Sequence, residues 1–463
     1  GGFAPIVAIS LRHDLPAWPD RSTIVAKEDG RPVHKAWLLL VAMAVWACVS
    51  LVPVRPSADG TGRLMTAAPW IRLDDGAGTG KVVGRVFPKL DGGSQTEPTA
   101  TSAAPTTSRA ASTTTVPATT VSAPVPVGTL SDASRADADW ILRAQGVDGA
   151  IFSHVDQQHV RPYLANFASI GLAAAARSSG NADYAAASWR WLAWYQAHMD
   201  GNGFVEDYDR VLGALVSTGD MDSTDAYAGT FLSAVRATFI VTGDVARLRS
   251  LQPGISAAVR AIELTQDVDG LTWAKPSYRV KYLMDQAETY AGLRSVAALA
   301  KTLADPALST RATAAADRME FAVHRSWNAA ASSYDWAKHE SGQWQQTDWS
   351  HLYSDSMQQI WAVAYGLADT SVRSTLVSTF LSAQPSWDLP TVMATYDSGQ
   401  HLVGYWAPAA WAMQRVGRTD LAARAVERLR AGATTSNRAW PFTPSDAGQL
   451  IVADTGSLDL LLP

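Results

Sequence analysis

Residues 225–264 read DAYAGTFLSAVRATFIVTGDVARLRSLQPGISAAVRAIEL and contain two helical patterns of different kinds. Residues 225–241 are small and apolar on almost every side, which is typical of a helix that is buried all round. A short turn at Thr242-Gly243-Asp244 follows, and residues 245–264 then combine an apolar stripe with a charged face. The second pattern predicts a helix with one side in solvent. The stretch therefore predicts a hairpin of one inner and one outer α-helix.

The same alternation of helix types extends over residues 130–463. Six amphipathic segments predict outer helices: 131–145, 182–198, 245–264, 306–327, 371–383 and 419–431. Six apolar segments predict inner helices: 162–176, 225–241, 286–303, 356–367, 402–414 and 455–462. A strict alternation with a repeat of about 55 residues predicts an all-α domain, an (α/α)6 barrel of six helical hairpins.

Long loops precede several of the inner helices. Asp-Gly or Asn-Gly turns occur at residues 200–205 and 267–273, and a Tyr- and Trp-rich stretch occupies residues 333–344. Such turns, flanked by apolar residues, indicate short β-hairpins. The loops at the opposite ends of the inner helices are short. Because function commonly resides in long loops over a rigid scaffold, we expect the site at the N-terminal ends of the inner helices.

The N-terminal part of the chain has a different composition. Residues 36–54, AWLLLVAMAVWACVSLVPV, are uncharged and long enough to cross a bilayer. They predict a transmembrane signal anchor in the cell membrane, preceded by a cytoplasmic tail at residues 1–35. A cleaved signal peptide, which would give a secreted protein, and a lipoprotein signal ending at Cys48 are alternatives. Residues 55–129, rich in Ser, Thr, Ala and Pro, predict a disordered, extracytoplasmic stalk.

Composition excludes several classes of partner. The net charge of −5 argues against a nucleic-acid partner. Cys48 is the only cysteine, so the chain can form neither an internal disulfide nor a cysteine-based zinc site. No His, Asp or Glu cluster has the spacing of metal ligands, and we expect no metal and no cofactor. The 18 tryptophans either fill a core or stack on sugar rings.

Two inner helices open with the same arrangement of acids. One begins Asp222-Ser-Thr-Asp225-Ala-Tyr-Ala-Gly and the next begins Asp285-Gln-Ala-Glu288-Thr-Tyr-Ala-Gly. Helix capping alone could explain the pattern, with Asp222 and Asp285 as N-caps. Catalysis is the alternative, because glycosidic cleavage needs one protonated acid and one ionised carboxylate. In that interpretation the helix dipole keeps Asp222 and Asp285 ionised, and burial raises the pKa of Asp225 and Glu288.

Polar and aromatic residues at corresponding positions of the other loops and inner helices are candidate sugar contacts. The full set of predicted substrate-binding residues is Asn166, Tyr227, Tyr290, Trp273, Trp336, Trp344, His351, Asp355 and Trp406.

These features resemble the six-hairpin glycosidase-like superfamily. The resemblance covers residues 130–463 and rests on the six hairpins, the Asp267-Val-Asp-Gly-Leu-Thr-Trp turn, the Asp222-Ser-Thr-Asp225 helix opening and the Trp-rich loops. It implies that the acids at inner-helix N-termini, Asp222, Asp225, Asp285 and Glu288, are catalytic. The chain is then expected to be an extracytoplasmic, carbohydrate-active hydrolase that cleaves glycosidic bonds of an oligo- or polysaccharide.

Two other functions fit the same scaffold. A polysaccharide lyase would need basic residues in the funnel, and Arg161, Lys275, Arg279 and Lys281 are available for it. A non-catalytic glycan-binding or cell-envelope protein would need only Trp stacking and capping carboxylates.

Overall fold

The computed structural model describes residues 70–73, 81–85, 128–394 and 401–462. The predicted cytoplasmic tail, the transmembrane anchor and most of the stalk lie outside these residues. Within the predicted stalk, strands β1 (Trp70–Leu73) and β2 (Lys81–Arg85) pair in an antiparallel hairpin. None of the helices in the described ranges is both long enough and apolar enough to cross a membrane.

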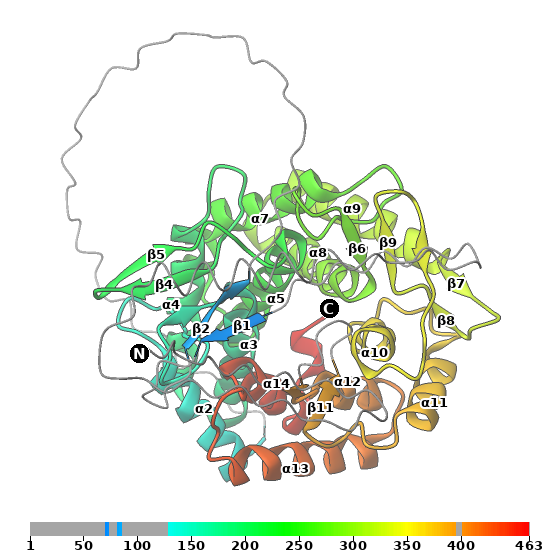
Figure 1. Ribbon diagram of the computed structural model, residues 1–463. Helices are drawn as coiled ribbons and strands as arrows, with labels where there is room; N and C mark the ends of the chain where they lie inside the picture. Colours follow the sequence, from blue (N-terminus) through cyan, green and yellow to red (C-terminus); the bar gives the residue numbers. More distant parts are fainter. Residues whose placement is uncertain (1–69, 74–80, 86–127, 395–400, 463) are drawn as a thin grey trace, which may run out of the picture. The chain divides into compact units, whose positions relative to one another are not determined.

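Six inner helices form a closed ring (Figure 1). Each packs on the next in chain order, and the sixth packs on the first, which closes the barrel. The predicted all-α fold of six helical hairpins is confirmed. The inner helices are α3 (Pro162–Ser179), α5 (Thr224–Thr242), α8 (Leu283–Leu303), α10 (Met357–Ala364), α12 (Pro408–Arg415) and α14 (Pro444–Asp454).

An outer helix precedes each inner helix and packs against the ring. In the last of them, the buried residues Leu421, Val426 and Leu429 form one stripe, while Glu427 on the other face is exposed. This is the amphipathic pattern of a helix that covers a core. The outer helices are α2 (Asp132–Ala144), α4 (Ala182–Ala197), the broken pair α6 (Val245–Ser250) and α7 (Gln252–Thr265), α9 (Pro306–His324), α11 (Arg373–Ala383) and α13 (Thr419–Thr435).

Glycines set the closest approaches within the ring. A Cβ atom on Gly292 of α8 would lie 2.3 Å from the carbonyl oxygen of Gly229 of α5. A Cβ atom on Gly171 of α3 would lie 2.2 Å from the Cα of Gly448 of α14. No side chain fits at these distances, so the sequence Tyr-Ala-Gly shared by α5 and α8 brings their backbones into direct contact.

The strands of the described barrel occupy the loops that lead into the inner helices. β3 (His159–Val160), β4 (Tyr208–Val211) and β5 (Ala214–Ser217) form one sheet, in that order. A second sheet has the order β10 (Trp344–Gln345), β9 (Ala337–His339) and β6 (Val280–Tyr282). Two antiparallel pairs complete the set: β7 (Trp327–Asn328) with β8 (Ser333–Tyr334), and β11 (Thr391–Ala394) with β12 (His401–Gly404).

Two of the predicted inner helices are wrong in position. The sixth is α14, which begins after a capping box between Thr443 and Asp446 and ends before the predicted segment 455–462. The fifth begins only at Pro408, because residues 401–404 form strand β12. Both helices carry a proline in their first turn, where its fixed φ favours helix initiation.

The segment expected to be the sixth helix closes one end of the barrel. Its residues form a single 3-10 turn, Leu458–Leu460, which contacts α5. Leu460 and Leu461 are fully buried, and the carbonyl of Asp459 accepts a hydrogen bond from Arg236 near the end of α5. The apolar C-terminus therefore fills the end of the barrel where the inner helices end, and the opposite end carries the long loops.

Candidate active site

The predicted acids lie at the loop end of the barrel, on the neighbouring helices α5 and α8. Asp225 is the second residue of α5, Asp285 is the third residue of α8, and Glu288 lies almost one turn further along α8. The prediction that Asp222 and Asp285 are N-caps is wrong. Ser223 caps α5 by accepting a hydrogen bond from the Ala226 N–H, and Tyr282 stands at the cap position of α8 without a side-chain cap bond.

Asp225 is fully buried and held by three donors. Its Oδ1 accepts hydrogen bonds from Ser223 Oγ (2.7 Å) and the Ala226 N–H (2.8 Å), and its Oδ2 accepts one from Thr272 Oγ1 (2.6 Å). Burial raises the pKa of Asp225 to about 6, although these hydrogen bonds favour the ionised form. Asp225 thus ties the start of α5 to the loop that precedes α8.

Glu288 is fully buried in the centre of the ring. Its Oε1 accepts hydrogen bonds from Trp361 Nε1 of α10 (2.7 Å) and Tyr163 Oη of α3 (2.8 Å). Its Oε2 is buried and has no hydrogen-bond partner among the described residues. Burial raises the pKa of Glu288 to about 8, against the effect of the two hydrogen bonds. Glu288 is therefore protonated at neutral pH, and its Oε2 forms no hydrogen bond with the described residues.

Asp285 is 6% exposed, whereas Asp225 and Glu288 are completely inaccessible. Burial raises the pKa of Asp285 well above its usual value, and the nearby carboxylates of Asp225, Glu288 and Asp222 raise it further. Desolvation and like charge thus act against the ionised form of Asp285, which the helix dipole was predicted to favour. Asp222 is exposed in the loop before α5.

Aromatic rings surround the acids. Tyr353 stacks on Trp406 at 5.1 Å between ring centroids, and Trp406 meets the edge of Trp361 at 5.8 Å. Trp361 and Tyr163 then contact Glu288 directly. This connects the predicted sugar contact Trp406 to the acids. Tyr163 had not been predicted as a site residue. Its position in the first turn of α3, next to Pro162, was the only feature of the sequence that could have indicated it.

A second acidic group lies beside the first. Tyr227 Oη donates a hydrogen bond to Asp207 Oδ1 (2.8 Å) and accepts one from the Asp222 N–H (3.3 Å). Arg161 Nε lies 3.7 Å from Asp207 Oδ2, and His159 Nε2 lies 3.8 Å from the same oxygen. Burial raises the pKa of Asp207 to about 6, although Arg161 favours the ionised form. Asp207 had not been predicted, because strand pairing brings it here: its N–H bonds to the Asp220 carbonyl beside the β4–β5 hairpin, and β3 pairs with β4.

Two predicted sugar contacts bond to other groups of the barrel. Asn166 is fully buried, and its amide group bonds to Trp191 Nε1, the Tyr227 carbonyl and Thr230 Oγ1. Tyr290 hydrogen-bonds to Arg294, whose guanidinium lies 5.0 Å from the tyrosine ring centroid. Arg294 itself pairs with acids of the outer helix α9, so Tyr290 serves the contact between α8 and α9.

The remaining predicted contacts lie around the rim. Asp355 is buried and accepts a hydrogen bond from the Asp348 N–H (2.8 Å), and burial raises its pKa. His351 is half exposed, with Nδ1 3.6 Å from Asp348 Oδ2. Trp336 stacks on Tyr282 at 5.9 Å between ring centroids.

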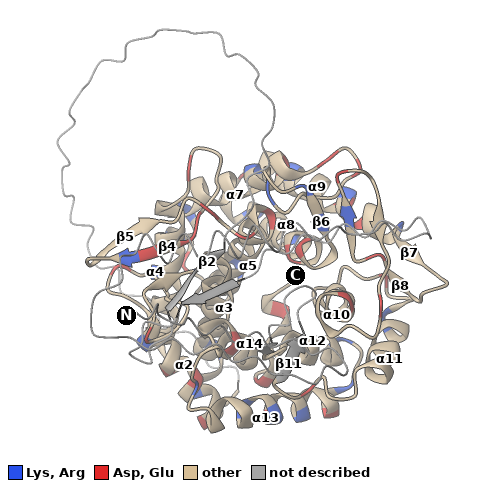
Figure 2. Ribbon diagram, viewed as in Figure 1, with Lys and Arg blue, Asp and Glu red and all other residues tan. Residues whose placement is uncertain are grey.

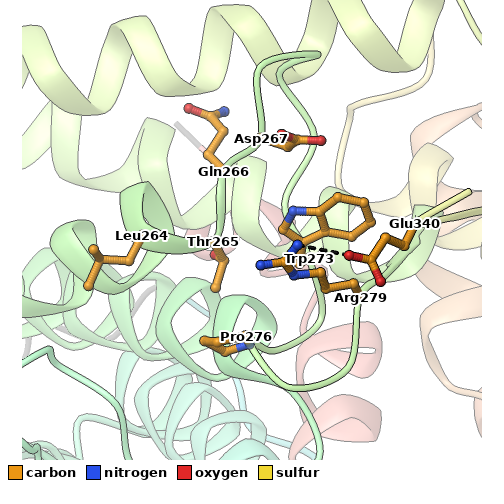
Figure 3. A pocket seen from close by; sticks show the side chains of 8 residues that line it. All are labelled: Leu264, Thr265, Gln266, Asp267, Trp273, Pro276, Arg279 and Glu340. Carbon is orange, nitrogen blue, oxygen red and sulfur yellow. Dashed lines mark hydrogen bonds and ion pairs between the residues drawn. The ribbon is translucent and has the colours of Figure 1, made fainter. Parts of the chain in front are cut away.

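Trp273 and Trp344 each lie under a lysine ammonium group, from Lys281 at 3.9 Å and Lys338 at 4.9 Å from the ring centroid. Trp273 lines a pocket on the outer side of the loop that precedes α8, and the predicted catalytic acids do not line it (Figure 3).

Within the described part of the chain, no cation is among the groups that shift the pKa values of Asp225, Asp285 and Glu288. Figure 2 shows blue segments on outer helices such as α13, and red segments of α8 near the middle of the ring. The four candidate cations for a lyase all have acidic neighbours: Arg161 with Asp207, Lys275 with Asp220, Arg279 with Glu340, and Lys281 with Asp267 and Asp269. Within the described ranges, no three His, Cys, Asp or Glu side chains are arranged to hold a metal ion.

Comparison with solved structures identifies the fold. The chain superimposes on a GH63 mannosylglycerate hydrolase from Thermus thermophilus, solved with glucose, with a TM-score of 0.51 at 14% identity, over 70% of this chain and 99% of that one. It superimposes on a wild-type glycosidase with a TM-score of 0.51 at 16% identity, over 72% of this chain and 97% of that one. The chain has the (α/α)6-barrel fold of glycoside hydrolases. The predicted resemblance is thereby confirmed for the fold.

Sequence comparison adds no relative: no protein-family model matches the chain, and no curated protein is similar to it.

Proposed function

We propose that the barrel is a glycoside hydrolase whose active site is the acid cluster of α5 and α8. The observation that carries this proposal is the burial of Asp225, Asp285 and Glu288 together, with raised pKa values and no cation among the groups that shift them. Uncompensated buried acids are costly to a fold, and they cluster at catalytic sites. Helix capping does not explain them, because Ser223 caps α5 and α8 has no side-chain cap.

Asp285 is the best candidate for the general acid. Burial and the nearby carboxylates favour its protonated form, and it alone of the three buried acids is partly exposed. A protonated carboxyl group can donate its proton to the leaving glycosidic oxygen. Asp222, exposed and close enough to raise the pKa of Asp285, is the candidate base that accepts a proton from the attacking water. Asp225 then acts as a positioning residue, because its carboxylate favours the protonated form of Asp285.

The glucose complexes of the similar glycosidases support a sugar of the pyranose class as substrate. We further propose that the barrel works outside the cytoplasm, on a single-pass anchor at residues 36–54 and a stalk that ends near residue 129. The support for this placement is the uncharged apolar run and the Ser-, Thr-, Ala- and Pro-rich composition that follows it.

The proposal is tested by assaying the full chain on a panel of neutral oligosaccharides for release of reducing ends. Asp285→Asn should lower the rate by about 10²–10⁴, since general acid catalysis contributes that much. Asp420→Asn, on the exposed side of α13, is the matched control and should cleave like the parent protein. Equal rates for the parent protein and Asp285→Asn would remove Asp285 from the mechanism. Unsaturated products from a uronate polymer would favour the lyase, and binding without cleavage would favour a glycan-binding protein.

A further inference from the structure

A pocket of about 490 Å³ lies on the outer rim of the barrel, next to the loop that leads into α8 (Figure 3). It lies between the end of α7, the Asp267 turn and the strands β6 and β9. Its lining includes Leu264, Asp267, Trp273, Pro276, Arg279 and Glu340. The volume is in the range of pockets that hold small ligands.

The pocket and the acid cluster use opposite sides of one loop. Thr272 is buried and donates its hydroxyl to Asp225 Oδ2, and the side chain of Gln286 bonds to its backbone N–H and carbonyl. Trp273, the next residue, lines the pocket instead. Successive residues of an extended segment point to opposite faces, so a ligand in the pocket does not contact the acids.

The lining has the chemistry of a site for a neutral sugar. Trp273 is half-buried, and Lys281 covers one face of its indole without lining the pocket, so another part of the ring faces the pocket. Figure 3 shows Asp267 on one side of this indole and Arg279 with Glu340 on the other. Arg279 is 54% exposed and Glu340 63% exposed, so both present polar atoms to a ligand.

Charges around the pocket balance. Three cations, Arg279, Lys281 and Lys338, pair with three anions, Glu340, Asp267 and Asp269. A charged ligand would have to break one of these pairs, whereas the hydroxyl groups of a neutral sugar can bond to both partners. An apolar indole surface beside paired charged groups suits the C–H face and the hydroxyl rim of a pyranose ring.

We propose that this pocket is a second glycan-binding site, which holds one neutral pyranose unit against Trp273, separate from the acid cluster. Such a site would keep a polymeric substrate on the protein between cleavage events. Binding here requires no catalysis, so it can be tested independently of the proposed hydrolase.

The test uses the full chain labelled with 5-fluorotryptophan and followed by fluorine NMR. The Trp273 resonance, one of 18, is assigned by its loss in Trp273→Phe. Glucose, which cannot be hydrolysed, should shift this resonance in a saturable way with a dissociation constant on the order of 1 mM. Arg279→Ala should weaken this binding about tenfold, through loss of one charge-assisted hydrogen bond.

Two controls separate this site from the rest of the protein. Phe321→Ala removes an exposed aromatic ring of α9 that also lies beside an arginine, and it should leave the titration unchanged. Asp285→Asn should leave it unchanged as well, so that failure of the hydrolase and failure of this site give different results. No response of the Trp273 resonance to glucose, or a response to glucuronate alone, would overturn the proposal.

Discussion

Replacement of Glu288 by glutamine should change how the stability of the protein depends on pH. Glu288 is fully buried, and burial raises its pKa from 4.5 to about 8. Below pH 4.5 the side chain is protonated in both the folded and the unfolded chain. Between pH 4.5 and 8 the unfolded chain ionises and the folded chain does not, so the free energy of unfolding falls as pH rises. A change from 4.5 to about 8 corresponds to about 5 kcal/mol.

Urea denaturation followed by helical circular dichroism, at pH values from about 5 to 8, measures this effect. Glu288→Gln keeps the shape of the side chain but cannot ionise, so the variant should lose less stability than the parent protein over this range, by about 3–4 kcal/mol. Glu427→Gln, at an exposed position of α13, is the control and should follow the parent protein. Parallel pH profiles for Glu288→Gln and the parent protein would refute the buried, protonated state of Glu288.

Three other predictions concern packing, the second acidic group and topology. Gly292→Ala should cost about 1–3 kcal/mol of unfolding free energy or more, because its Cβ would clash with Gly229, whereas Gly201→Ala, in open space, should be nearly neutral; thermal melting compares the two. Asp207→Asn should alter the acidic limb of the pH–rate profile near pH 6, where Asp207 titrates, and an unchanged limb would exclude Asp207 from the reaction. Protease added to intact cells should release a soluble fragment that begins near residue 130, and protection of the barrel until lysis would contradict an extracytoplasmic barrel.

Sequence periodicity was sufficient to predict most of the ring. The segment 225–241 is apolar all round because α5 is enclosed by α3, α8 and its outer helices. The burial of a helix on all sides therefore leaves a recognisable pattern in its sequence. The last hairpin was misplaced for the same reason. Residues 458–462 are nearly as apolar as an inner helix, but they form a single 3-10 turn, and Leu460 and Leu461 are buried in the end of the barrel. Apolar composition reports burial and does not distinguish a short helix from a buried terminus.

The acids could be located from the sequence, but their states could not. Asp222, Ser223 and Thr224 are all good capping residues, so the sequence did not determine which one caps α5. The raised pKa of Asp285 depends on its burial and then on the approach of α8 to α5, and both result from tertiary contacts. Asp207 reaches the same region through strand pairing, of β4 with β3 and of β4 with β5. Periodicity within a single helix contains no information about such contacts.

The most direct test of the proposed active site is a crystal structure of full-length Asp285→Asn soaked with an oligosaccharide that the parent protein cleaves. The amide substitution should preserve the fold and trap the uncleaved sugar. The proposal predicts a glycosidic oxygen within about 3.2 Å of the side chain at position 285, the reach of a general acid. Sugar density in the Trp273 pocket alone, or a glycosidic oxygen beyond the reach of position 285, would contradict the assignment of this acid cluster as the catalytic site.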